Sequence, residues 1–78
     1  MRDNISKARE CLKKIKYYYD NAGANGYSQA MFYFSELSKR YRDGAKNDQP
    51  IIQSFYNEAK ELMDEMKKWQ DDFKKENP

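Results

Sequence analysis

Apolar residues recur along this chain at alternating spacings of three and four, which is the period of one helix face. Three stretches carry the pattern, and clusters of Gly, Asn and Asp separate them at residues 20–26 and 43–48. No stretch alternates residue by residue as a strand would. The pattern therefore predicts helices at about 4–21, 27–43 and 49–75. Their apolar stripes are Ile5, Ala8, Leu12, Ile15 and Tyr19; Tyr27, Ala30, Phe34, Leu37 and Tyr41; and Ile52, Phe55, Ala59, Leu62, Met66, Trp69 and Phe73.

The segments between the stripes predict how the helices are arranged. Gly23 and Gly26 tolerate the left-handed backbone that a turn needs, and Pro50 falls in the first turn of the third helix, where its missing N–H costs nothing. Asp3 or Asn4 offers a cap for the first helix. Connections of about six residues make neighbouring helices antiparallel. We therefore predict an all-α fold, an antiparallel three-helix bundle in which residues 1–78 form a single domain and 76–78 start a linker.

Size and residue usage argue against an enzyme. A chain of 78 residues buries only about 60–65% of its unfolded surface, which leaves no room for a deep catalytic cavity. With no His and one Cys, neither a standard zinc site nor a His-activated nucleophile can be assembled, so no metal or cofactor is expected. A single Cys makes no intramolecular disulfide, which favours a reducing, cytoplasmic setting. The longest apolar run, residues 30–34, is far short of the roughly 20 residues of a membrane span, so no membrane insertion is expected.

The net charge of +2 conceals an uneven distribution. Residues 1–46 hold ten Lys/Arg against five acids, whereas residues 47–78 hold five Lys against eight acids. A basic patch attracts polyanions through a field that salt screens, although such residues also form ordinary solvated helix faces. A sequence pI near 8.6 and the lack of any helix-turn-helix or RNA-binding aromatic motif argue against nucleic acid. The candidate patch comprises Lys13 and Lys14 of the first helix, with Arg40, Arg42 and Lys46 near the next loop.

The third helix carries a second row beside its core stripe: Tyr56, Lys60, Met63 and Lys67. Apolar and basic residues alternate along it, as a groove that accepts an acidic amphipathic peptide would require. The other interpretation is the edge of the core, covered by lysine stems. Ion pairs of the third helix are predicted between Asp64 and Lys68 and between Asp71 and Lys75.

Several large or reactive side chains lie beside the stripes of the first two helices. We expect Met31 and Cys11 in the core and Tyr17 facing water. Phe32 and Tyr33 cannot both be buried together with Phe34 on one narrow face, so at least one of them should be exposed. An exposed aromatic ring on a rigid helix is either a partner contact or a ring lying flat on the surface.

The first connection resembles a known family. Residues 20–23, Asp-Asn-Ala-Gly, followed by Tyr27-Ser-Gln-Ala30-Met-Phe-Tyr33, resemble the helix 1–2 junction of MIT (microtubule-interacting and trafficking) domains, although Ala24-Asn25-Gly26 stands where that family commonly has Asn alone. Within the family, the sequence is most similar to the N-terminal domain of katanin-type microtubule-severing AAA ATPases. The residues that carry this second likeness are Tyr27, Ala30, Met31, Tyr33, Glu58, Ala59, Lys60, Met66, Lys67 and Phe73.

The resemblance implies a targeting domain. A katanin-type domain would bind acidic tubulin tails of microtubules, and a regulatory subunit, in the cytoplasm at the cytoskeleton. The family also binds peptide helices between helices 2 and 3 or helices 1 and 3, where Tyr56, Lys60, Met63 and Lys67 would lie. Two alternatives stay open: an MIT module for a peptide of a membrane-sorting filament, and a free-standing small helical inhibitor or immunity protein. In each case we expect the isolated domain to be a monomer.

Overall fold

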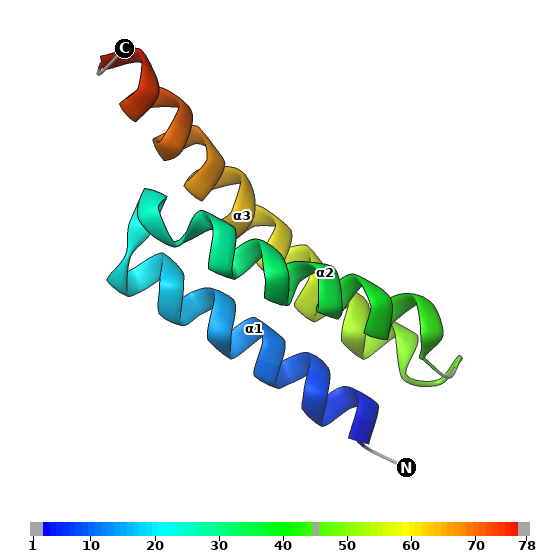
Figure 1. Cartoon of the computed structure of the whole chain (residues 1–78). Coiled ribbons are helices and arrows are strands. Elements are labelled where there is room, and N and C mark those ends of the chain that lie inside the picture. The colour runs from blue at the N-terminus through cyan, green and yellow to red at the C-terminus, as the bar shows by residue number, and fades with distance from the viewer. Residues whose placement is uncertain (1–2, 45, 77–78) are drawn as a thin grey trace.

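The protein is a bundle of three α-helices in antiparallel order, seen here in a computed structural model that describes residues 3–44 and 46–76 (Figure 1). Helix α1 covers Asp3–Asn21, a 3-10 turn η1 covers Gly23–Gly26, α2 covers Tyr27–Asp43 and α3 covers Gln49–Glu76. The predicted all-α, antiparallel three-helix bundle is confirmed. Of the predicted linker, Glu76 still belongs to α3, and residues 77–78 lie outside the described residues.

Two glycines shape the connection between α1 and α2, each for a different reason. Gly23 has φ +55, the left-handed region that other residues rarely adopt, and it is the only described residue with a positive φ. Gly26 has φ −90, which any residue tolerates, but a Cβ there would lie 2.9 Å from the Cβ of Ala22. Backbone hydrogen bonds close the turn, with the Ala22 N–H donating to the Tyr18 carbonyl at 2.9 Å.

The core lies along the axis where the three helices meet. Ile15, Leu37, Ile52 and Met66 are its largest fully buried side chains, and together they come from all three helices. Three alanines at the same seam, Ala8, Ala30 and Ala59, are also fully buried and allow close approach of the helices. These positions come from the predicted stripes, so the stripes identify the centre of the core correctly.

The end of α3 lies beyond the rest of the bundle. Helix α3 has 28 residues, against 19 in α1 and 17 in α2, and Figure 1 shows it continuing past the α1–α2 connection. Trp69 is 37% exposed and packs against Tyr19 with ring centroids 5.1 Å apart, and Phe73 is 62% exposed. The prediction that both residues belong to the core is wrong at Phe73 and only partly met at Trp69, because α1 and α2 end before they can cover this part of the stripe.

Candidate functional site

The two apolar residues of the row predicted as a peptide groove on α3 already pack against the rest of the bundle. Met63 is only 3% exposed and belongs to the core, so its prediction as a surface contact is wrong. Tyr56 is half-buried, stacked against Phe34 and Tyr41 of α2 at centroid distances of 5.1 and 5.8 Å. The row lies one step from the core stripe, and the aromatic rings of α2 reach across it. It is the edge of the core, the second of the two interpretations offered above.

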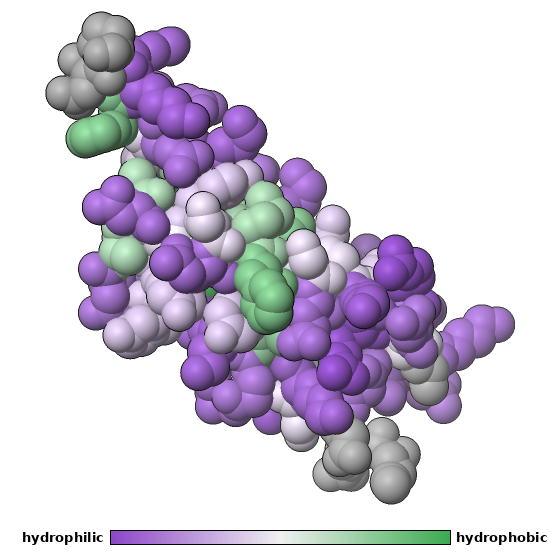
Figure 2. All heavy atoms as spheres, viewed as in Figure 1, coloured by the Kyte–Doolittle hydropathy of each residue, from purple (hydrophilic) through white to green (hydrophobic). Residues whose placement is uncertain are grey.

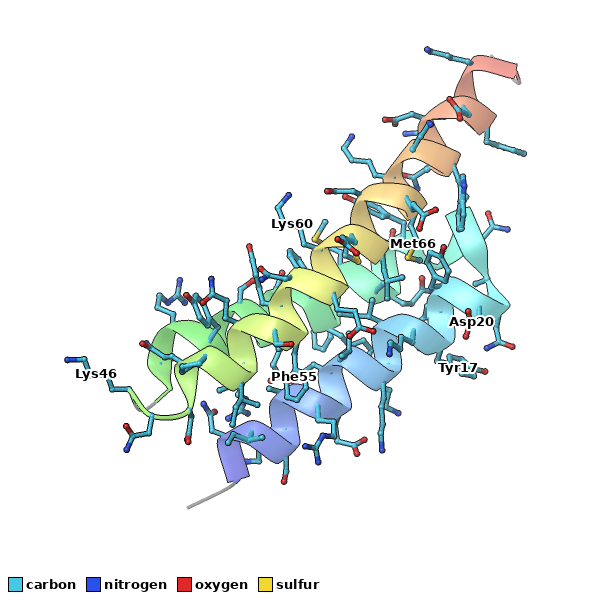
Figure 3. All side chains as sticks on the ribbon, turned by 180° about the vertical axis from the view of Figure 1, so that it is seen from behind. Tyr17, Asp20, Lys46, Phe55, Lys60 and Met66 are labelled. Atoms are coloured by element: carbon cyan, nitrogen blue, oxygen red, sulfur yellow. The ribbon has the colours of Figure 1, made fainter. Side chains whose placement is uncertain are left out.

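The two lysines of that row are exposed and paired within their own helix. Lys60 Nζ lies 3.4 Å from an oxygen of Asp64, and Lys67 Nζ lies 3.4 Å from an oxygen of Asp71. Each lysine therefore pairs with the acid one turn later, rather than each acid pairing with a later lysine as predicted. Figure 3 shows Lys60 directed away from the other helices. Neighbouring carboxylates thus partly compensate these cations.

Arg40, predicted as part of a basic patch, joins α2 to the start of α1. The Asn4 amide donates to the Arg40 carbonyl at 3.0 Å, and the Arg40 guanidinium donates to the Asn4 side-chain oxygen at 3.4 Å. A second guanidinium nitrogen lies 3.9 Å from Glu36. Arg40 is half-buried, so it has a structural role that a partner would have to share. Asn4, in turn, bonds across the bundle; the side chain of the other predicted cap, Asp3, lies outside the described residues.

The remaining predicted basic residues do not gather in one place. Arg42 is exposed and 3.9 Å from Asp43, while Lys46 extends from the α2–α3 loop at one end of the bundle (Figure 3). Lys14 lies ten residues after Asn4, the residue that contacts Arg40, which places it about 15 Å further along α1. Lys13 is exposed and lies 3.8 Å from Glu10. The basic residues are therefore distributed over α1, α2 and the α2–α3 loop.

The only cysteine lies within the seam between α1 and α2. Cys11 is 4% exposed, as predicted, and its thiol lies 3.8 Å from a carboxylate oxygen of Glu36, to which it donates. Burial, together with the negative charge of Glu36, raises the pKa of the Cys11 thiol to about 11. At neutral pH the sulfur is therefore a protonated, enclosed thiol, which is a poor nucleophile.

The outward face of α2 carries a feature that was predicted only in part. Phe32 is 69% exposed and Met31 is 36% exposed, so the prediction of Met31 in the core is wrong. Tyr33 is half-buried against Tyr18, so Phe32 is the exposed member of the pair of which at least one was predicted to be exposed; Tyr17 is 58% exposed, as predicted. Figure 2 shows apolar side chains in the middle of the face that α2 presents, with hydrophilic side chains around them.

A shallow depression follows this face of α2. The sequence signal for it is a second helical spacing, 28-31-35-39-42, which none of the core stripes uses. We define the outer α2 face by the residues that line the depression and point away from the core: Ser28, Met31, Phe32, Ser35, Lys39 and Arg42.

The comparisons with known proteins leave the chain without an assigned family. No family model, no curated protein and no solved structure matches it. Among residues 3–44 and 46–76, no group of three or more acidic, Cys or His side chains is placed to hold a metal ion. In the same part of the chain, no helix combines the length and apolar character that crossing a bilayer requires.

Proposed function

We propose that this domain is a non-catalytic docking module that binds acidic protein segments through the side formed by α1 and α2. The partner suggested by the resemblance to MIT domains is the acidic tail of tubulin, with the domain targeting a microtubule-severing ATPase to microtubules in the cytoplasm. A regulatory subunit or peptide helix is the second partner that this resemblance suggests.

The observation that carries the proposal is the difference in charge along the chain: residues 1–46, which include α1 and α2, hold ten Lys/Arg against five acids, whereas residues 47–78, which include α3, hold five Lys against eight acids. Lys7, Lys14 and Lys39 are exposed and have no ion-pair partner within the described residues. On α3, Lys60 and Lys67 each lie beside a carboxylate of the same helix, while Lys68, Lys74 and Lys75 are exposed without an ion-pair partner among the described residues but lie in the acidic part of the chain. The excess of basic over acidic residues on α1 and α2 produces the stronger local field for a carboxylate-rich partner.

The excess of acids on α3 also favours a protein partner over nucleic acid. A nucleic-acid site needs several phosphate contacts, whose counterion release gives most of the affinity. The α1–α2 side offers few unpaired cations, spread along the helices, and residues 47–78 carry eight acids against five lysines. A short acidic peptide needs only two or three such contacts.

Microtubule cosedimentation over a salt series tests the proposal. We expect the domain to pellet with microtubules at low salt, less so as salt rises, and less so when the tubulin tails are removed by subtilisin. The test variant replaces Lys14, Lys39 and Arg42 by Glu. Its control replaces Lys68, Lys74 and Lys75 by Glu, which changes the net charge equally at exposed lysines of α3.

The two triple variants give opposite expectations. The α1–α2 variant should lose binding, and the α3 control should retain most of it. Equal binding of both variants, or binding that does not depend on the tubulin tails, would refute the proposal. Arg40 stays unchanged in both, because its contacts with Asn4 make any loss ambiguous.

A further inference from the structure

The outer α2 face has the length and width of a binding surface for one helix. At 100° per residue, its six residues lie within an arc of roughly 100°. The arc is centred opposite Ala30 and Leu37, which are fully buried. From Ser28 to Arg42 the face is about 21 Å long, the length of a helix of about 14 residues. The face therefore matches one partner helix lying along α2.

The arrangement of small and large side chains on the outer α2 face suits close packing of a second helix. Ser28 and Ser35 stand two turns apart near the centre line of the face, and both are exposed. Between them lie the large side chains of Met31 and Phe32, one on each side of the line. Small residues on the centre line and large ones beside it let side chains of a second helix interlock at axis distances of 8–10 Å.

Charge and hydropathy divide the face into two halves. The half near the α1–α2 turn holds Met31 and Phe32, and the half near the α2–α3 loop holds Lys39 and Arg42. Lys39 has no ion-pair partner in the described part of the chain. The carboxylate of Glu36, at the margin of the depression, is engaged with Cys11 and Arg40. The basic half is thus left for carboxylates of a partner, apart from the exposed pair of Arg42 with Asp43.

We propose that the outer α2 face binds an acidic amphipathic helix of a partner protein. The partner would place apolar side chains over Met31 and Phe32 and carboxylates over Lys39 and Arg42. The inference rests on the proposed docking function and specifies the partner segment: a helix with an apolar stripe, rather than an extended acidic tail. Acids in the first turn of that helix would also favour its dipole, which makes it antiparallel to α2.

The face fits a second copy of this chain less well. In an antiparallel pair of α2 helices, Lys39 and Arg42 of one copy would lie over the serines and apolar residues of the other. Glu36, which lines the depression, and Asp43, which follows Arg42, already have basic partners on their own chain. A copy therefore places basic side chains over the apolar half and leaves the basic half without carboxylates. An acidic helix matches both halves.

Titration with three peptide probes tests the inference. The first is a 16-residue helical peptide with glutamates in its first turn and leucines at spacings of three and four along one face. The second has the same composition in an order that destroys the face, and the third is polyglutamate of equal charge. Affinity is measured by fluorescence anisotropy, and the site is located by amide NMR shifts at Ser28, Met31 and Ser35.

Substitutions of two exposed phenylalanines distinguish specific binding at the outer α2 face from nonspecific hydrophobic binding. Phe32→Gln removes the apolar anchor, and Phe73→Gln is its control on α3, with a similar exposed fraction of 62% against 69%. We expect the amphipathic peptide to bind about tenfold or more tightly than the other two probes. Phe32→Gln should weaken binding of the amphipathic peptide at least about tenfold, as loss of a central aromatic contact does. Phe73→Gln should change the affinity for the same peptide less than about twofold.

Each other outcome overturns a defined part of the argument. Equal binding of polyglutamate and the amphipathic peptide, with no effect of Phe32→Gln, refutes this inference and leaves the docking function intact. Failure of all acidic probes, together with failure in cosedimentation, refutes the docking function itself. A dimer in analytical ultracentrifugation that Phe32→Gln abolishes, or Phe32-dependent binding to phosphatidylserine vesicles, would replace the acidic helix by a second copy or a lipid surface.

Discussion

The enclosed thiol of Cys11 gives a direct test of the packing between α1 and α2. The side chain is 4% exposed, and the pKa of the thiol is raised from 9.0 to about 11, chiefly by burial and next by the charge of Glu36. In the unfolded chain the same thiol ionises near its ordinary pKa. Raising the pH from 9 to 11 therefore deprotonates the unfolded state before it deprotonates the folded state.

The sign and size of the effect follow from proton linkage. Between pH 9 and 11 the unfolded state binds fewer protons than the folded state, so the free energy of unfolding falls as the pH rises. The contribution is fully present below pH 9 and is lost as the pH rises through the folded pKa of about 11. A pKa difference of about two units corresponds to a loss of at most about 2.7 kcal/mol.

Urea unfolding of the wild type and of Cys11→Ala, followed by circular dichroism between pH 8 and 11, measures this term. The alanine variant loses the packing of the sulfur at every pH, which appears as a constant offset. Tyr19, whose pKa is raised by its hydrogen bond to Glu65, titrates in both proteins and cancels in the difference. The wild type should lose stability more steeply than the variant above pH 9. If the free energy of unfolding depends on pH in the same way in both proteins, the burial of the thiol and its contact with Glu36 are both refuted.

Three further substitutions test the turn, the core and the α3 surface by the same unfolding measurement. Gly26→Ala should cost about 1–3 kcal/mol, because its Cβ would meet the Cβ atoms of Ala22 and Tyr18 at 2.9 and 3.0 Å; a cost below about 0.5 kcal/mol would contradict that crowding. Leu37→Ala should cost about 2–5 kcal/mol, since the side chain is fully buried, and a surface-like cost would disprove its place in the core. Lys60→Gln, which breaks one exposed pair with Asp64, should change stability by less than about 0.5 kcal/mol; a larger loss would mean that the pair is more than a surface contact.

The sequence predicts the helices well because their signals are local. The apolar period and the glycine- and asparagine-rich breaks act over a few residues, and α2 covers the predicted 27–43. The exposure of Trp69 and Phe73 near the end of α3 was not predicted, although the lengths of the predicted helices already imply it. A predicted third helix of 49–75 is about three turns longer than the second, so its last residues extend beyond the ends of the other two helices.

The assignment of residues to the core or to the surface on α3 depends on the neighbouring helices. A helix packed against two others buries a wide arc, and the centre of that arc is set by where the two neighbours lie. The stripe places Leu62 at the centre and Met63 at the edge, but Leu62 is half-buried and Met63 is buried. A small rotation of α3 about its axis exchanges the degree of burial of these two residues. Spacing within one helix carries no information about that rotation, so the groove predicted at Met63 could not be tested from the sequence.

The outer α2 face is better explained by contact with a partner than by stability of the bundle. Serine and phenylalanine favour helices less than alanine, glutamate or lysine do, yet Ser28, Phe32 and Ser35 occupy the face of α2 turned away from the core. Phe32 is 69% exposed and therefore contributes little buried area to the fold. Phe32→Gln should accordingly leave the free energy of unfolding unchanged or slightly raised while it weakens peptide binding. A side chain whose loss changes binding and not folding is what distinguishes a docking surface from the edge of a core.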